Sequence, residues 1–393
     1  MGLTRQDLFC QHDPDYERTP PLPQHVRKAA QAIMQCRTAA LGGHIQACPE
    51  GHFSRIWSNS CRHRACPPCT FIQTERWLAA QQSRLLACDP YPVIFTLPHD
   101  LNALWVSNVE TLSQILFHSA RKTLFELLGD PTSLGAQPGM IAALHTWSQT
   151  LVLHPPLHGL VTGGGVNAEG EWLPVRNGYL LPARVVMALF RGKMVAGLRR
   201  ALAHDELILA DGMRPQQVLN LLHRLGHANK TRWHVRLMEG YPHGAGVATD
   251  LARYRRGGPL KHSRLVAMDQ EAVSFTYRER GEQAGSRGPG VMGLGLDAFM
   301  SRLLLPVPPP RRRVVRSDGL YHPSQALRLD ACGVQWDQSP VKAPERLRWT
   351  EVCSRVGESP PERCPSCGQD LISWGRVARG GHPPTVGERP LAA

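Results

Sequence analysis

Cysteine and histidine residues near the N-terminus have the spacing of metal ligands. Cys66 and Cys69 form a CxxC hook with two prolines between the thiols. Such a hook places two thiolates on one tight turn, and a second pair of ligands then closes a tetrahedral zinc site. We predict that Cys48 and His52 form that second pair. Two further residues compete with this pair or add to it, namely Cys61 and His63. Reduced cysteines without a metal are the less common alternative for such a cluster.

A second CxxC motif lies near the C-terminus, at Cys364 and Cys367. One hook of this kind is half of a zinc site and needs two more ligands. The other half could come from Cys332, Cys353 or His322. We therefore expect a small zinc knuckle in the C-terminal tail.

The number and placement of the cysteines favour metal binding over disulfide bonds. The chain has 11 cysteines among 393 residues, and none lies between Cys88 and Cys332. The N-terminal residues carry charges and prolines where a signal peptide has an apolar core, so a secreted disulfide framework is not expected. The sequence has no run of about 18 apolar residues that would indicate a membrane span. We expect a soluble cytoplasmic protein.

The charge of the chain suits a polyanionic partner. The net charge is +13 and the isoelectric point is about 9.5, which favours nucleic acid, although ribosome-associated proteins and enzymes of anionic substrates share this property. Basic and aromatic residues alternate with the first cysteines, at Arg55, Trp57, Arg62 and Arg64. This arrangement favours contact with DNA, and a solvated basic face has the same composition.

A predicted helix over residues 185–203 carries another basic face, which includes Lys193. Basic helical faces are usually only solvated. Contact with a phosphate backbone is the second interpretation, because several other basic stretches accompany this one.

Tyr254 lies in a predicted helix over residues 249–256 and has arginine on both sides. Its neighbours are Arg253, Arg255 and Arg256. Guanidinium groups stabilise a phenolate and hold a phosphate, which a tyrosine nucleophile in phosphodiester cleavage requires. A packed or exposed helical tyrosine with no chemical role is the alternative.

Two histidines occur in an apolar segment that we expect to be a buried strand over residues 147–165. His154 and His158 lie on the same face of an extended chain, but four residues span about 13 Å, too far for one metal ion unless Pro155 and Pro156 bulge the strand. We expect the three glycines from Gly163 to end the strand in a turn, where a backbone or a ligand comes close. Core histidines without a metal are the alternative.

The order of predicted elements indicates an α+β fold with a central antiparallel sheet flanked by helices. A proline-bounded segment, 90–98, is the expected first strand of that sheet, and a helix follows over 101–128. The expected domains are a flexible arm (1–24), a zinc-binding and DNA-binding domain (25–88), a catalytic domain (89–305), a basic linker with the C-terminal CxxC region (306–375) and a disordered tail (376–393). Within them we also predict a strand pair over 262–280 and a short helix over 288–305.

Six blocks of the sequence, in one order, resemble the rolling-circle transposases of the insertion-sequence ninety-one family, and especially its common-region branch. The resemblance extends from about Cys36 to Leu371. The blocks are CRTAALGGH (36–44), NSCRHRACPPC (59–69), HPPLHGLVTGGG (154–165), LFRGK (189–193), DLARYRRGGP (250–259) and CPSCG (364–368).

The resemblance implies a sheet of the HUH-endonuclease type. In that superfamily a His-hydrophobe-His pair on a central antiparallel strand binds Mg²⁺ or Mn²⁺, and a tyrosine on a later helix attacks the scissile phosphate. The implied product is a 5′-phosphotyrosyl bond on single-stranded DNA with a free 3′-hydroxyl. The family's zinc-binding head is taken to help bind transposon-end DNA. The implied partners are thus single-stranded transposon ends and target DNA, in a protein associated with the nucleoid.

Two positions depart from the family pattern. Pro156 stands where the first histidine of the metal pair belongs, which leaves His158 and the preceding His154. Asp250 stands in place of the first tyrosine of a YxxxY motif, which leaves Tyr254 alone.

Three functions are weighed on this basis. The leading one is a transposase with Tyr254 as nucleophile, His158 as metal ligand and His154, or a group such as His145 or Gln149, as substitute for the missing histidine. The second is a DNA-binding transposase remnant that no longer cleaves. A zinc-dependent hydrolase is the weakest, because the sequence has no HExxH motif and no deaminase signature. Binding to single-stranded DNA is expected to weaken as salt rises.

Overall fold

A computed structural model describes most of the chain. The described residues are 6–10, 23–209, 212–227, 233–241, 260, 262–278, 289–305, 307–340, 348, 351 and 362–381. The chain forms two compact units. The first, here called the head unit, comprises Met1–Trp77, Arg255–Pro309 and Glu345–Ala393, and the second, the sheet unit, comprises Leu78–Tyr254 and Pro310–Pro344. The five-part division expected from the sequence stays a prediction.

The sheet unit is built on an antiparallel sheet in the order β11-β4-β5-β3-β7. Its strands are β3 (Tyr91–Thr96), β4 (Gln137–Leu144), β5 (Leu157–Val166), β7 (His234–Leu237) and β11 (Val315–Gly319), and β6 (Trp172–Pro174) pairs with the end of β5. The strand expected between Pro90 and Pro98 is confirmed as β3 in this sheet. The antiparallel α+β class predicted from the sequence is therefore correct.

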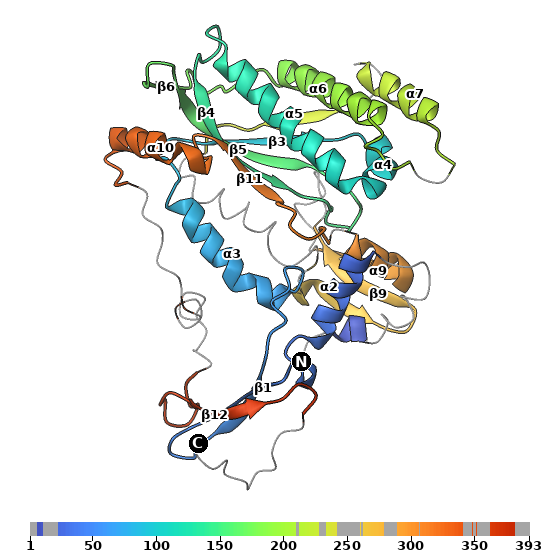
Figure 1. Cartoon of the computed structure of the whole chain (residues 1–393), viewed down its shortest axis with the longest axis vertical. Helices are drawn as coiled ribbons and strands as arrows, with labels where there is room; N and C mark the ends of the chain where they lie inside the picture. Colours follow the sequence, from blue (N-terminus) through green and yellow to red (C-terminus); the bar gives the residue numbers. More distant parts are fainter. Residues whose placement is uncertain are drawn as a thin grey trace. The chain divides into compact units, whose positions relative to one another are not determined.

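One face of this sheet is covered by helices, as Figure 1 shows. They are α4 (Asn102–Ser107), α5 (Val109–Gly129), α6 (Ala183–Ala203) and α7 (Pro215–Gly226). The single helix expected over 101–128 is interrupted at Asn108, whose side-chain amide donates hydrogen bonds to the carbonyl oxygens of Leu104 and Ile208.

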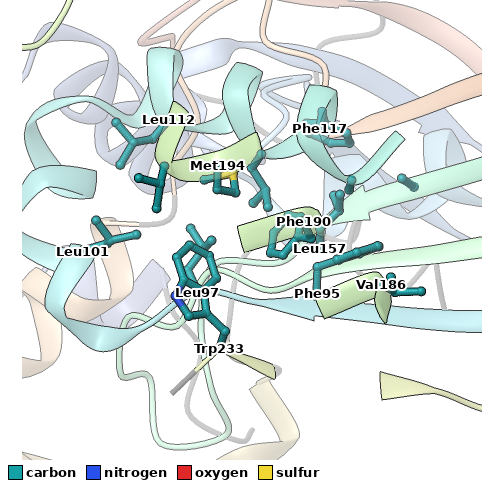
Figure 2. Packing of buried hydrophobic residues seen from close by; sticks show 14 of the residues in the cluster. Phe95, Leu97, Leu101, Leu112, Phe117, Leu157, Val186, Phe190, Met194 and Trp233 are labelled. Carbon is teal, nitrogen blue, oxygen red and sulfur yellow. The ribbon is translucent and has the colours of Figure 1, made fainter. Parts of the chain in front are cut away.

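The main hydrophobic core lies between this helical layer and the sheet. Alternate strand residues such as Phe95 and Leu157 point into it, and Phe190 and Met194 of α6 meet them. The rings of Phe95 and Phe190 lie 4.7 Å apart, as Figure 2 illustrates. Because side chains alternate along a strand, residues next to these core positions point to the opposite face of the sheet.

Strand β5 begins ten residues later than the sequence analysis predicted. The segment before it forms an irregular loop, in which Trp147 bridges to Leu153 and Leu151 has a positive φ of 61°. Pro155 and Pro156 lack N–H groups and cannot donate to a sheet ladder, which explains why regular pairing starts at Leu157. The predicted strand over 147–165 is therefore wrong in its first half, and His154 does not lie on it.

The glycines at the other end of β5 do not stop the strand. Gly163, Gly164 and Gly165 all lie inside it. A Cβ atom at Gly163 would lie 2.2 Å from the carbonyl oxygen of Asp89, and one at Gly164 would lie 2.5 Å from that of Leu173. The close approach of neighbouring backbone, which the sequence suggested, is present, but the turn is not.

The head unit contains two further antiparallel sheets. One has the order β12-β1-β2, from Ile372–Val377, Gly43–Ala47 and Ser54–Ser58, and the other has the order β10-β9-β8, from Gly290–Gly295, Ala272–Tyr277 and Leu265–Met268. The helices of this unit include α2 (Gln24–Gln35) and α9 (Leu296–Leu304), residues 6–10 are also helical, and α3 (Pro67–Gln82) begins in it.

Two sequence predictions for the head unit can be compared with these elements. The strand pair over 262–280 is present as β8 and β9, and Asp269 shapes its turn by accepting the N–H groups of Glu271 and Ala272. The helix predicted over 288–305 begins only at Leu296, because residues 290–295 form β10.

The remaining regular elements are short. They are α10 (Ala326–Gly333) and the 3₁₀ helices η1 (Ala39–Leu41), η2 (His99–Leu101), η3 (His262–Arg264), η5 (Pro323–Gln325) and η6 (Val334–Trp336). Among the described residues, no helix is both long and apolar enough to cross a bilayer.

Candidate functional site

Four cysteines of the head unit converge on one point and are here called the four-cysteine cluster. They are Cys36, Cys61, Cys66 and Cys69, whose sulfur atoms all lie within 4.8 Å of one another. Cys36 follows the end of α2, Cys61 lies after β2, and the CxxC hook opens α3. The Sγ of Cys69 is 3.5 Å from the Sγ of Cys36 and 3.5 Å from that of Cys61. Two sulfurs bound to one zinc ion lie about 3.8 Å apart, so the spacing fits.

The chemistry of this cluster also fits a zinc ion. Three of its four cysteines are buried, away from competing water. Hydrogen bonds from the thiols of Cys36, Cys61 and Cys66 hold the pKa of Cys69 below its ordinary value. The cluster therefore stabilises a thiolate, which is the form that binds metal.

A second group joins residues from both ends of the chain and is here called the split cluster. It consists of Cys48, His52, Cys364 and Cys367, with ligand atoms within 4.8 Å of one another. The Sγ of Cys48 lies 3.5 Å from the Sγ of Cys367 and 3.8 Å from Nδ1 of His52.

The grouping of ligands corrects the pairing expected from the sequence. Cys48 and His52 do not complete the site of the Cys66 and Cys69 hook but lie with the C-terminal hook. Cys36 and Cys61 take the two places that they were expected to fill, and Cys61 was one of the competing ligands named from the sequence. The spacing of the cysteines did not indicate Cys36 as a ligand, because it lies 30 residues before the hook.

The other proposed ligands lie elsewhere. His63 belongs to neither cluster, and its Nδ1 accepts the N–H of Ala65. Cys332 and His322, expected near the C-terminal hook, belong to the sheet unit and to neither cluster. Cys353 lies outside the described residues.

His158 lies on the central strand of the six-stranded sheet. It pairs with Ile94 of β3 on one side and with Ala143 of β4 on the other. Its neighbour Leu157 points into the helix-covered core, so His158 points to the opposite face. We call this side the histidine face, and it carries His145, His158, His234 and Arg236.

His145 is the imidazole that the structure brings to His158. It comes directly after β4, and its backbone N–H donates to the carbonyl of Pro156 at 3.0 Å, which continues the β4–β5 register. The ring centroids of His145 and His158 lie 5.7 Å apart. His145 thus stands across the ladder from Pro156 and diagonal to His158, on the same face.

His154 is placed differently. Its ring lies 5.4 Å from that of His99, at the start of the α4 region. The Pro155–Pro156 segment is buried and joins the ladder rather than carrying His154 along the strand. Of the two histidines among the substitutes considered for the missing ligand, His145 and not His154 therefore lies beside His158.

The basic residues singled out in the sequence have separate environments. Arg62 is exposed and has a positive φ of 55°, whereas burial lowers the pKa of the half-buried Arg64. Lys193 forms a 2.6 Å salt bridge with Glu126 in the helical layer, on the side of the sheet away from His158. Tyr254 and its neighbours Arg253, Arg255 and Arg256 lie outside the described residues.

Two cation positions were missed by the sequence analysis. Arg236 is exposed on the histidine face, paired through Ile94 with His158. Arg376 of β12 lies opposite His44 of β1, which in turn lies opposite Trp57 of β2. Their only signal in the sequence was a basic residue in a short strand, which is common on surfaces.

Comparisons with known proteins match two family models to the chain. A family model described as "Putative transposase" matches residues 139–328, a range that contains His145, His158 and Tyr254. A second model, described as "Transposase zinc-binding domain", matches residues 8–97. That range contains the four-cysteine cluster but not the C-terminal half of the split cluster. No solved structure matches the chain.

Two curated relatives extend over most of the chain. The "Putative transposase y4qJ" of Sinorhizobium fredii (strain NBRC 101917 / NGR234) is 33% identical over 374 residues, which is 92% of each chain. The "Transposase for insertion sequence element IS801" of Pseudomonas savastanoi pv. phaseolicola is 28% identical over 361 residues, covering 86% of this chain and 81% of the relative.

The two family models, together with the fold and the cysteine-rich head unit, define the chain as a transposase. This is a DNA-processing enzyme, and it includes a zinc-binding domain. The chain belongs to the insertion-sequence ninety-one (IS91) family of transposases. The resemblance found in its sequence blocks is thus confirmed.

Proposed function

We propose that this chain nicks single-stranded DNA at the ends of its own insertion element and transfers the strand by a rolling-circle reaction, with Tyr254 as nucleophile. The observation that supports this proposal is the position of His158. It lies on the central strand of an antiparallel sheet, on the face free of the α4–α7 layer, with the imidazole of His145 beside it. The substrate would bring the protein to the bacterial nucleoid.

The imidazoles of His145 and His158 are two candidate ligands for a divalent metal ion. Within the described ranges, groups of three or more metal-binding side chains occur only as the two cysteine-containing clusters, so a metal site here would take two protein ligands, His145 and His158, from the described residues. Imidazole is the preferred ligand of Zn²⁺, Fe²⁺ and Ni²⁺, whereas Mg²⁺ and Mn²⁺ prefer oxygen ligands, which the scissile phosphate and water would add beside the two histidines. When bound there, Mg²⁺ or Mn²⁺ would polarise the scissile phosphate as a Lewis acid.

The residues of the chain would carry out the covalent step. The phenolic oxygen of Tyr254 attacks the phosphorus and loses its proton, and the bond from phosphorus to the 3′-oxygen breaks. The 3′-oxygen leaves as a hydroxyl after taking up a proton, and the DNA 5′-phosphate stays on the tyrosine. The phosphotyrosyl ester conserves the bond energy, so a later 3′-hydroxyl can reverse the exchange without ATP.

Arginine side chains near the reacting groups would bind phosphates of the DNA. Arg253, Arg255 and Arg256 are neighbours of Tyr254 in sequence and would hold the phosphate while charge develops on it. Arg236 stands two strands from His158 on the histidine face, about 10 Å away in the sheet. It would bind a flanking phosphate of the same strand.

The head unit offers a surface for DNA recognition. The Arg55 guanidinium lies 4.4 Å from the ring centroid of Trp57, and it donates two hydrogen bonds to the side-chain oxygen of Gln46. An arginine held over an aromatic ring can stack with bases and bind phosphate. We propose that this pair, kept in place by a zinc ion on the four-cysteine cluster, contacts transposon-end DNA.

Pro156 supports a second candidate function, a DNA-binding remnant without cleavage. Its ring occupies the strand position opposite His145 and offers no donor atom to a metal. If His145 does not act as substitute, His158 remains as a lone ligand, and affinity for a weakly held ion falls by orders of magnitude.

A nicking assay on single-stranded DNA from the element's end, with Mn²⁺, separates His145 from His154. We expect His145→Ala to lower the nicking rate at least about tenfold, the effect of losing about 1.4 kcal/mol or more of transition-state stabilisation. His154→Ala should have the smaller effect, because His154 lies by His99. A larger loss for His154→Ala would show that the proline segment rearranges to bring His154 to the metal. Equal rates for both variants and the original chain would exclude a role for either residue.

A further inference from the structure

The two ends of the chain meet in one small sheet of the head unit. Strand β12 pairs with β1 in antiparallel register from Gly43↔Val377 to Ala47↔Ile372, as Figure 1 shows. The hairpin of β1 and β2 belongs to the N-terminal region, so the pairing spans more than three hundred residues: Cys48 and Cys367 are 319 positions apart. Some interaction must hold the C-terminal strand in that place.

Both hooks of the split cluster are tight turns that a glycine N–H closes on the first cysteine, over four residues in the first hook and over five in the second. In the first, between β1 and β2, the N–H of Gly51 donates to the carbonyl of Cys48, and Gly51 has a φ of 76°. In the second, just before β12, the N–H of Gly368 donates to the carbonyl of Cys364, and Gly368 has a φ of 73°. Two such turns side by side are how zinc-ribbon proteins present their ligands.

We propose that Cys48, His52, Cys364 and Cys367 bind one structural zinc ion, and that this ion fastens the C-terminal strand β12 to the β1–β2 hairpin. The four ligand atoms lie within 4.8 Å of one another. Three thiolates and one imidazole form a Cys₃His set, which is common in tetrahedral structural zinc sites. The site draws half of its ligands from beyond the region matched by the zinc-binding family model.

Burial of apolar surface does not account for the attachment of β12. The first three residues of β12 are all exposed, Ile372 at 46% and Trp374 at 42% among them. The ion pair of Arg363 with Asp370 is also exposed, and exposed pairs contribute little to stability. The backbone pairing with β1 joins two segments that are far apart in the sequence. A structural zinc ion supplies folding free energy outright in small domains, so an ion on the split cluster would add a strong link beside the backbone pairing.

A disulfide between Cys48 and Cys367 is the competing explanation, because their sulfurs are 3.5 Å apart. It would leave Cys364 and His52 without a task, although both point their ligand atoms to the same place. A shared ion uses all four residues.

Fastening β12 to β1 would also add Arg376 to the side of this sheet that carries Arg55 and Trp57. Arg376 is opposite His44 in the β1–β12 ladder, and His44 is opposite Trp57 in the β1–β2 ladder. Loss of the ion would release β12 and remove Arg376 from the side that carries Arg55 and Trp57.

The test is the number of zinc ions bound per molecule of the purified full-length protein, measured by inductively coupled plasma mass spectrometry. The original chain should hold one zinc ion more than the Cys364→Ser/Cys367→Ser double variant. Cys48→Ser should lose one ion as well, and the triple variant should lose no more than one in total, because all three cysteines serve one ion. Cys332→Ala is the matched control, a buried cysteine near the same end of the chain, and should keep the full content.

Three results would overturn the proposal. They are unchanged zinc content in the double variant, unchanged zinc content in Cys48→Ser, and losses that add to two ions in the triple variant. A measurement on the unaltered protein covers variants that fail to fold: a zinc chelator should raise the alkylation rates of Cys48 and Cys367 together. Equal alkylation of Cys367 with and without chelator, or a Cys48–Cys367 disulfide in the metal-loaded protein, would equally contradict it.

Discussion

Replacement of His158 by alanine is expected to lower the rate of single-stranded DNA nicking about a thousandfold. His158 is the metal-binding histidine that remains on the central strand, and its ring lies beside that of His145. Loss of Lewis-acid stabilisation worth several kcal/mol corresponds to about that factor in rate. The measurement is a nicking assay with labelled element-end DNA and saturating Mn²⁺, together with a DNA-binding assay in which His158→Ala should change affinity little.

The matched control for this experiment is His204→Ala. His204 is an exposed histidine that caps the end of α6, in the helical layer on the other side of the same sheet. It should nick at the original rate. Thermal unfolding of both variants checks that the sheet is intact. Nicking by folded His158→Ala within about threefold of the original rate would remove the metal role of the histidine face.

Replacement of Cys69 by serine is expected to remove one zinc ion and to open the N-terminal part of the head unit to protease. Cys69 is the sulfur that lies 3.5 Å from two others, and its pKa is held low by its three neighbours. Serine is a poor zinc ligand, and a structural ion contributes about 10–16 kcal/mol in small domains, far more than the rest of so small a core supplies. Zinc content and limited proteolysis followed by peptide mapping measure the effect.

Cys10→Ser controls for the loss of a thiol as such, because Cys10 is exposed and belongs to neither cluster. It should keep its zinc and its protease resistance. The central sheet of the Cys69→Ser variant should remain resistant, since its core lies in the other unit. Full zinc content in Cys69→Ser would mean that the four-cysteine cluster is not the metal site of this domain.

Local sequence signals predicted the elements whose boundaries are marked by local chemistry. Pro90 and Pro98 bracket β3 closely, and the Asp269 turn between β8 and β9 was visible because its side chain caps its own turn. The error at β5 has the same origin. Apolar residues before Leu157 look like strand, yet the absence of N–H groups at Pro155 and Pro156 prevents the ladder from starting earlier.

The sequence indicated which residues are metal ligands better than it indicated which ligands share a site. Both CxxC hooks, as well as Cys48 and His52, were singled out by spacing, and all of these residues lie in one of the two clusters. Which hook meets which depends on the β1–β12 pairing across the whole chain, and no local pattern encodes that. Cys36 was missed for the same reason. It directly follows α2, and the position of that helix brings its sulfur to the Cys66 and Cys69 hook.

The register of the sheet decides which histidine stands beside His158. The sequence named His145 only as one of several substitutes, because the β4–β5 register that brings it opposite Pro156 depends on a long-range pairing. His154, closer in sequence, is carried away by the loop before Leu157. Proximity along the chain was therefore a poor guide to proximity in the site.

The most direct test of the central claim is the covalent adduct between the protein and its DNA. Labelled single-stranded DNA from the element's end is incubated with Mn²⁺ and with the original chain, Tyr254→Phe or Pro156→His, and the products are separated under denaturing conditions. We predict that the original chain forms a 5′-phosphotyrosyl adduct and that Tyr254→Phe forms none. An adduct with Pro156→His alone would contradict this account and leave the natural chain as a DNA-binding protein that no longer cleaves.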